Sequence, residues 1–337
     1  MLEKPDVKDE QIIACLQAEY GLRAAQITFL PLGADQNTAV YRVTIEAGTP
    51  YFLKLRSGVS DETAVILPRF LADQGLAQII APLETRSGRL WAELDSFKLI
   101  LYPFVEGRNG FEVELSEAQW LDFGRALKRV HTAVLPIELK SRIQRETYAP
   151  VGREIVKAFL ERIQVETFED PLAVKLAAFL NFKRSNVLGL VRRAERLAQV
   201  LQVGSPEFVL CHSDVHEGNV LIDAGDRLYI VDWDNPILAP KERDLMFIGA
   251  GIGGWTKPEH EALFYKGYGE TQVDPAALAY YRYERIVQDL AVYCQQLLLS
   301  NAGGADREQS LEYLLSNFLP DGTIAIAYRS DRTLRET

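Results

Sequence analysis

The polar residues with the clearest chemical pattern lie in the second half of the chain. His212, Asp214 and Asn219 follow an H-x-D-x-x-x-x-N pattern, and Asp232 comes directly after a short apolar run. This spacing is typical of a loop in which an aspartate contacts an attacking hydroxyl and an asparagine holds a metal ion. An aspartate after the next strand supplies a second metal ligand. The order of these residues therefore predicts phosphoryl transfer.

Each role follows from the chemistry of moving the terminal phosphoryl group of ATP to an alcohol. The protein must position the hydroxyl, accept or orient its proton and neutralise the charge that spreads over the phosphate oxygens. We expect Asp214 to face the hydroxyl, and Asn219 and Asp232 to hold Mg²⁺, which prefers oxygen ligands. His212 is expected to brace the loop backbone. Taken singly, such residues are more often turn or capping groups, but their joint order favours chemistry.

The first hundred residues offer a complementary set of nucleotide-binding residues. Lys54 lies in an alternating apolar run, where a strand lysine can orient the α- and β-phosphates of ATP. Glu62, near the start of the next predicted helix, is the expected partner of this ammonium group. The ordinary alternative is a lysine that faces solvent.

Two further segments are expected to contact the nucleotide. The loop 32–38 contains Gly33, Asp35 and Asn37, which could cover the phosphates with backbone N–H groups and polar side chains, although it is not a G-x-G-x-x-G loop. Tyr102 and Phe104 belong to an apolar segment whose backbone groups are expected to bind adenine.

The hydrophobic pattern predicts an α+β protein with two lobes, a small β-rich N-terminal lobe and a larger, mainly helical C-terminal lobe. We expect the nucleotide-binding lobe to span 1–104 and the catalytic and substrate-binding lobe to span 105–337. Strands are predicted at 40–45, 51–55, 90–94, 97–104, 208–210, 220–222 and 228–231. Helices are predicted at 9–20, 61–74, from 116 onward, and at 152–164, 171–201, 259–267, 275–300 and 307–318.

Charge and composition restrict the class of protein. The chain has 337 residues, a hydrophobic content of 47% and a net charge of −10, which argues against a nucleic-acid binder and is compatible with a cationic small-molecule substrate. Its three cysteines are far apart and suggest free thiols in a reducing compartment. We find neither a secretory signal nor an apolar run near the ~20 residues of a membrane helix. A cytoplasmic protein without membrane contact or an obligatory protein partner is expected.

Taken together, these motifs resemble the aminoglycoside phosphotransferase family, a branch of the protein-kinase-like fold. The catalytic loop and Asp232 match, Asp234 stands at the family's second acidic position, and Asp244 matches an aspartate that braces the lobe below the active site. Similar segments extend over most of the chain: 33–35, 51–55, 102–104, 211–214, 240–249 and 281–287.

The resemblance implies an ATP- and Mg²⁺-dependent enzyme that phosphorylates a hydroxyl of an aminocyclitol or aminoglycoside antibiotic and so gives resistance. Within the family, similarity is greatest to members that act on spectinomycin, which makes this aminocyclitol the expected acceptor. Only seven residues separate Asp232 from Pro240, too few for the long activation segment with which a protein kinase docks a peptide.

Two alternatives remain open from the sequence. A kinase of a small metabolite, such as a sugar or an amino alcohol, would carry the same catalytic motif. A nucleotide-binding pseudokinase that serves as an interaction module is disfavoured, because Lys54, Asp214, Asn219 and Asp232 are all present.

Overall fold

The computed structural model describes residues 3–33, 37–58, 61–249, 257–300 and 303–336. They form two compact units, each described below by itself. The first comprises Met1–Gln119, Ala133–Arg142 and Gly218–Pro236, and the second comprises Trp120–Thr132, Ile143–Glu217 and Ile237–Thr337. The lobe boundary expected near residue 104 stays a prediction.

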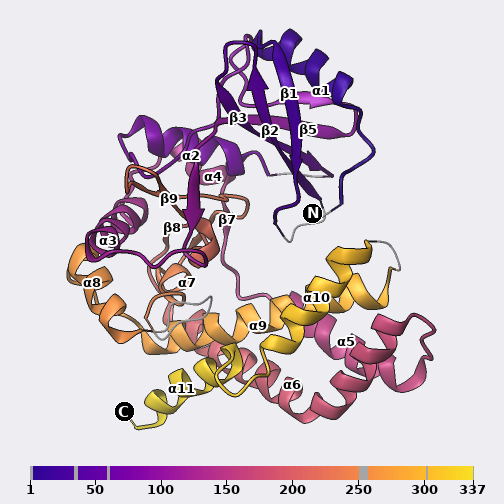
Figure 1. The fold of residues 1–337 in the computed structure, drawn as a ribbon. Coiled ribbons are helices and arrows are strands. Elements are labelled where there is room, and N and C mark those ends of the chain that lie inside the picture. Colours follow the sequence, from indigo (N-terminus) through magenta and orange to yellow (C-terminus); the bar gives the residue numbers. More distant parts are fainter. Residues whose placement is uncertain (1–2, 34–36, 59–60, 250–256, 301–302, 337) are drawn as a thin grey trace. The chain divides into compact units, whose positions relative to one another are not determined.

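The first unit is built around a five-stranded antiparallel sheet (Figure 1). Its strands, in spatial order, are β1 (Ala24–Leu30), β2 (Thr38–Ile45), β3 (Pro50–Ser57), β5 (Phe97–Pro103) and β4 (Ala92–Leu94). One face of the sheet packs with α1 (Asp9–Cys15) and the π-helical turn Leu16–Tyr20 in an apolar core that includes Ile12, Leu53 and Leu55. Because successive strand side chains point to opposite faces, Lys54 lies on the other face, as its place in the sequence predicts.

The remaining elements of this unit are short. They are α2 (Thr63–Asp73), α4 (Ile137–Arg142) and a three-stranded sheet ordered β10 (Leu228–Ile230), β9 (Val220–Asp223) and β6 (Gly107–Asn109). An isolated bridge between Ile79 and Ile230 and a hydrogen bond from Ile230 N–H to the Gln78 carbonyl connect β10 to the segment after α2.

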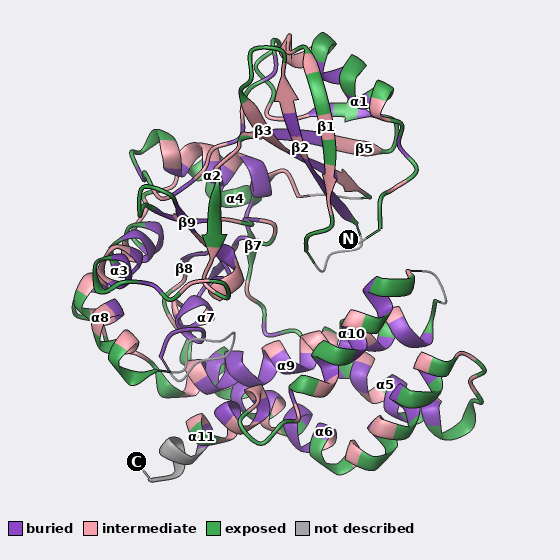
Figure 2. Ribbon diagram, viewed as in Figure 1, coloured by how far each residue is buried: buried purple, intermediate pink, exposed green. Residues whose placement is uncertain are grey.

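The second unit is mainly helical and centres on α9 (Pro275–Leu298). This helix packs with α5 (Val151–Val165), α6 (Pro171–Gly204), α10 (Gly304–Ser316) and α11 (Thr323–Glu336). Figure 2 shows that much of α9 is buried. Aspartates cap two of these helices: Asp170 accepts from Ala173 N–H, and Asp274 from Ala276 and Ala277 N–H. The unit also contains α7 (Glu242–Leu245), α8 (Pro258–Tyr268) and a small sheet ordered β7 (Gln144–Arg145), β11 (Ile237–Ala239), β8 (Val209–Cys211).

The helix α3 (Glu117–His131) contributes residues to both units. Its start is a capping box, in which Ser116 N–H donates to the Gln119 side chain at 2.8 Å and Gln119 N–H donates to the Ser116 hydroxyl at 3.3 Å. The predicted helices and strands are confirmed to within a few residues, whereas the elements β1, β6, β7, β11, α4, α7 and α11 were not predicted. No helix among the described residues is both long and apolar enough to cross a membrane.

Candidate active site

Lys54 on β3 lies between two aspartates of the segment after β10. Its Nζ is 2.8 Å from Asp232 Oδ1 and 2.7 Å from Asp234 Oδ1, and Arg56 Nη1 lies 3.1 Å from the same oxygen of Asp234. Burial disfavours the ammonium form, yet the two carboxylates outweigh this effect and raise the pKa of Lys54. Lys54 is therefore a buried, permanently charged group and not a solvent-facing strand lysine.

The backbone at Asp232 explains how two aspartates separated by one residue reach the same lysine. Asp232 adopts a left-handed conformation with φ 66°, which aspartate tolerates better than most residues. Trp233 between them is buried, and its indole N–H donates to the Ile230 carbonyl at 3.1 Å. The tryptophan thus anchors the turn, while the Asp232 side chain stays 47% exposed.

Asn219 lies beside this turn. It ends the 3₁₀ turn Glu217–Asn219 that leads into β9, and its carbonyl accepts the N–H of Val231 at 2.9 Å. This hydrogen bond places the backbone of Asn219 beside the residue that directly precedes Asp232. Amide and carboxylate oxygens are the donors that Mg²⁺ prefers, so this set fits the predicted metal.

The predicted ion pair between Glu62 and Lys54 is wrong for this structure. Glu62 directly precedes α2 and pairs instead with Arg142 of α4, while Lys54 is paired with Asp232 and Asp234. The buried face of α2 begins only at the next residue, Thr63, so the Glu62 side chain stays at the surface. The expectation of a carboxylate at the start of the next helix pointed to the wrong residue.

The other predicted nucleotide contacts lie on or just after β5 and in the segment between β1 and β2. Tyr102 pairs with Phe52 across β5 and β3 and shares the sheet face of Lys54, and the ring centroids of Phe104 and Phe52 are 6.4 Å apart. Gly33 is exposed with φ 84°, a conformation that favours glycine. The Asn37 carbonyl accepts Ser57 N–H at 2.9 Å, and Asp35 lies outside the described residues.

In the second unit, Asp214 is held by an arginine that sequence reasoning did not identify. Arg285 Nη1 of α9 lies 2.6 Å from Asp214 Oδ1, and His216 Nε2 lies 3.8 Å from Oδ2. Burial opposes ionisation, but Arg285, His216 and His212 together lower the pKa of Asp214. Asp214 is therefore a carboxylate at neutral pH. The sequence signals for Arg285 are its place in the family-like segment 281–287 and its i,i+4 spacing to Asp289 on a helix. Neither assigns it a role, because such spacing is common on solvated faces.

Asp244 holds the backbone just before Asp214. Its Oδ2 accepts His212 N–H at 2.9 Å, and its Oδ1 accepts Ser213 N–H at 2.6 Å. These two amides converge because Ser213 has a left-handed φ of 73°. His131 Nε2 is also 2.9 Å from Asp244 Oδ2, and His131 Nδ1 is 2.7 Å from the Tyr268 hydroxyl. This network matches the bracing role expected for Asp244.

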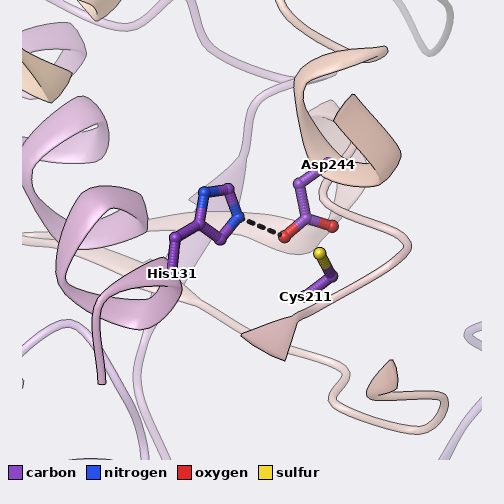
Figure 3. A group of neighbouring side chains, drawn as sticks. All are labelled: His131, Cys211 and Asp244. Atoms are coloured by element: carbon purple, nitrogen blue, oxygen red, sulfur yellow. Dashed lines mark hydrogen bonds and ion pairs between the residues drawn. The ribbon is translucent and has the colours of Figure 1, made fainter. Parts of the chain in front are cut away.

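His131, Asp244 and Cys211 lie close enough together to suggest a metal site (Figure 3). Their hydrogen bonds argue against one, because both nitrogens of His131 and both oxygens of Asp244 are already bonded to protein groups. Burial raises the pKa of the Cys211 thiol well above its ordinary value, so the thiolate that would bind a metal is disfavoured. The cluster is a structural brace.

His131→Ala tests this brace. We expect a loss of about 3–5 kcal/mol in the free energy of unfolding, because the buried Asp244 carboxylate would lose its side-chain partner. Denaturant titration measures the change. His260, which stacks on Trp120 at 4.8 Å and is partly exposed, gives a matched His260→Ala control with a smaller expected loss. Equal losses in the two variants would show that the Asp244 network has no special weight.

Comparisons with known proteins agree with this geometry. A model of the phosphotransferase enzyme family matches residues 28–281. The curated protein StrN of Streptomyces griseus is 23% identical over 301 residues, which cover 88% of this chain and 86% of StrN.

Solved structures show the same fold. A spectinomycin phosphotransferase in complex with ADP and spectinomycin is 39% identical, with a TM-score of 0.89, and the match covers 97% of this chain and 99% of that enzyme. The choline kinase LicA from Streptococcus pneumoniae is 14% identical with a TM-score of 0.58, over 91% of this chain and 99% of LicA, which shows likeness of fold alone. The kinase-like α+β fold expected from the sequence is thereby confirmed.

Proposed function

The chain belongs to the phosphotransferase enzyme family, and from this premise we propose that it moves the γ-phosphoryl group of ATP to a hydroxyl of spectinomycin. The observation that carries the chemistry is the contact of Lys54 with Asp232, beside Asn219. These are the groups needed for phosphate orientation and metal binding. The observation that favours the acceptor is the near full-length similarity to an enzyme solved with ADP and spectinomycin.

We assign the phosphate end of ATP to the face of β3. Lys54 supplies a fixed positive charge for phosphate oxygens, and the oxygens of Asn219 and Asp232 would hold Mg²⁺. Mg²⁺, when bound, neutralises the charge that develops on the transferred group. Gly33 and Asn37 cover the phosphates, and the backbone at Tyr102 and Phe104 binds adenine.

Asp214 faces the acceptor hydroxyl in this proposal. Its lowered pKa makes it a weak base, so it orients the hydroxyl first and takes the proton late in the transfer, as the leaving oxygen departs. The net charge of −10 favours the approach of a cationic aminocyclitol over that of an anionic acceptor. A cytoplasmic location is part of the proposal, because the reaction consumes ATP.

Acceptor-dependent release of ADP tests the substrate directly. The panel contains spectinomycin, a kanamycin-type aminoglycoside, choline and a simple sugar, and mass spectrometry locates the added phosphate. We expect transfer to spectinomycin and little to the bulkier aminoglycoside, whose hydroxyl a compact site would hold out of line. Expression in a sensitive host should then give resistance. Efficient transfer to choline or the sugar, without transfer to spectinomycin, would establish the metabolite kinase instead.

Lys54→Ala should raise the KM for ATP and lower turnover, with a combined loss of about 10–100-fold in kcat/KM, because a charge-assisted contact to phosphate is removed. Steady-state kinetics with varied ATP measures the loss. Glu62→Ala is the matched control and should stay near wild type, since Glu62 pairs with Arg142. A defect in Glu62→Ala as large as that in Lys54→Ala would restore the Lys54–Glu62 pair for the nucleotide-bound state.

A further inference from the structure

One guanidinium group in α9 contacts two carboxylates at once. Arg285 uses Nη1 for Asp214, at 2.6 Å, and Nε for Asp289, at 3.0 Å, one helical turn further along α9. Its Cζ also lies 5.8 Å from the ring centroid of Phe247. The guanidinium group of Arg285 is thus held by Asp214 in the loop, by Asp289 on its own helix and by the ring of Phe247.

The two contacts use different edges of the planar guanidinium, which fixes its orientation. A lysine ammonium at the same place is a single point charge on a flexible stem and does not hold two carboxylates in a defined geometry. The atom that reaches Asp214 is therefore placed by Asp289.

We propose that Arg285 is a positioning residue that holds the Asp214 carboxylate toward the acceptor hydroxyl, and that Asp289 acts through Arg285 by fixing its guanidinium. This proposal rests on the proposed function of Asp214. It assigns no contact with substrate to Arg285 or to Asp289.

Electrostatics gives the arrangement a second effect. Asp214 is faced by Arg285, Asp289 and Tyr293 of α9 and by His212 and His216 of its own loop, and Arg243 of α7 acts on Asp289. Burial raises the pKa of Asp289 and works in the same direction on Asp214. For both aspartates, Arg285 makes the largest contribution that lowers the pKa. Removal of Arg285 therefore leaves two neighbouring carboxylates, each of which raises the pKa of the other.

Charge counting also agrees with a cationic acceptor. Asp214, Arg285 and Asp289 together carry one net negative charge when all are ionised. Arg285 can therefore keep Asp214 ionised without making the local charge positive, which would repel an ammonium group on the acceptor.

Three variants separate the charge of Arg285 from its geometry. Arg285→Gln should lower kcat by about 100-fold, because both are lost, and Arg285→Lys by about 10-fold, because the fixed orientation is lost. The KM for ATP should stay unchanged in both. Asp289→Asn should lower kcat by about 10-fold alone and by nothing further in the Arg285→Gln background, since it acts through Arg285.

The pH dependence gives a readout that a merely structural role would not move. In Arg285→Gln, the acid limb of the pH profile of kcat should shift to higher pH. Carboxyl ¹³C NMR should show an increased pKa for Asp214. In Arg285→Lys, the limb should stay near its wild-type position although kcat is lower. Arg153→Lys is the matched control, because Arg153 Nε lies 3.1 Å from Glu284, the neighbour of Arg285, and should leave the profile unchanged.

The outcomes distinguish failure of this proposal from failure of the proposed function. If the wild type phosphorylates no alcohol, the function fails, and the NMR titration still tests the contact between Arg285 and Asp214. If the wild type is active but Arg285→Gln keeps its kcat and pH profile, or loses thermal stability alone, the positioning role is overturned. Should Arg285→Gln fail to fold, Arg285→Lys and Asp289→Asn carry the same test.

Discussion

Asp214→Asn is expected to lower the kcat of phosphoryl transfer by about 10²–10⁴-fold and to leave Mg-ATP binding unchanged. The amide keeps the size of the side chain but cannot accept the proton of the hydroxyl. Mg²⁺ and ATP are assigned to Lys54, Asn219 and Asp232, so their binding should not depend on this carboxylate. Single-turnover kinetics measures the transfer, and calorimetric titration measures the nucleotide.

The state of Asp214 in the wild type sharpens this expectation. Arg285 and the two histidines hold its pKa below the ordinary value, against the effect of burial. Ionisation of Asp214 is therefore complete at neutral pH, and protonation removes its function only as the pH falls through that lowered pKa. A variant with wild-type kcat would remove Asp214 from the reaction, while a variant that also loses Mg-ATP binding would show that the change had damaged the fold.

Asp232→Asn is expected to reduce Mg²⁺-dependent ATP affinity by at least about 100-fold. Loss of outer-shell partners alone typically costs 10–100-fold in metal affinity, and Asp232 is assigned as a direct ligand. Asparagine tolerates the left-handed backbone at this position, so the substitution removes charge with little added strain. Titration of ATP with Mg²⁺ and with EDTA separates the metal-dependent part of binding.

Asp226→Asn provides a matched control for this variant. Asp226 lies in the turn between β9 and β10 and has a φ of 61°, close to the 66° of Asp232, but it is not assigned to the metal. It should bind Mg-ATP as the wild type does. Equal affinity losses in Asp214→Asn and Asp232→Asn would contradict the separate roles assigned to these two aspartates.

Local sequence patterns predicted the parts of the site that depend on strand alternation and loop spacing. Alternation placed Lys54 on the face opposite the core, and the apolar runs located the strands that flank Asn219 and Asp232. The hydrophobic pattern did not predict β1, because β1 is an edge strand whose residues are partly exposed in an irregular order. It also gave no indication of α4, a helix of six residues.

Partners far apart in sequence could not be predicted in this way. The contact of Lys54 with Asp232 joins residues 178 positions apart, and that of Arg285 with Asp214 spans 71 positions. Nothing local to Lys54 indicates which of several carboxylates it meets, so Glu62, at the start of the next predicted helix, is the wrong partner in this structure. Tertiary packing decides such pairs, and packing is not encoded in the spacing of a few residues.

The hydrogen bonds of Asp244 have a consequence for protein engineering. The backbone at His212 and Ser213 takes its shape from a carboxylate more than thirty positions away, which is itself held by His131 of α3. A designer who transplants residues 212–219 into another scaffold would move the reactive groups without the residues that shape them. The smallest transferable part is the loop together with Asp244 and His131, and a graft that omits those two should have the right side chains in the wrong places.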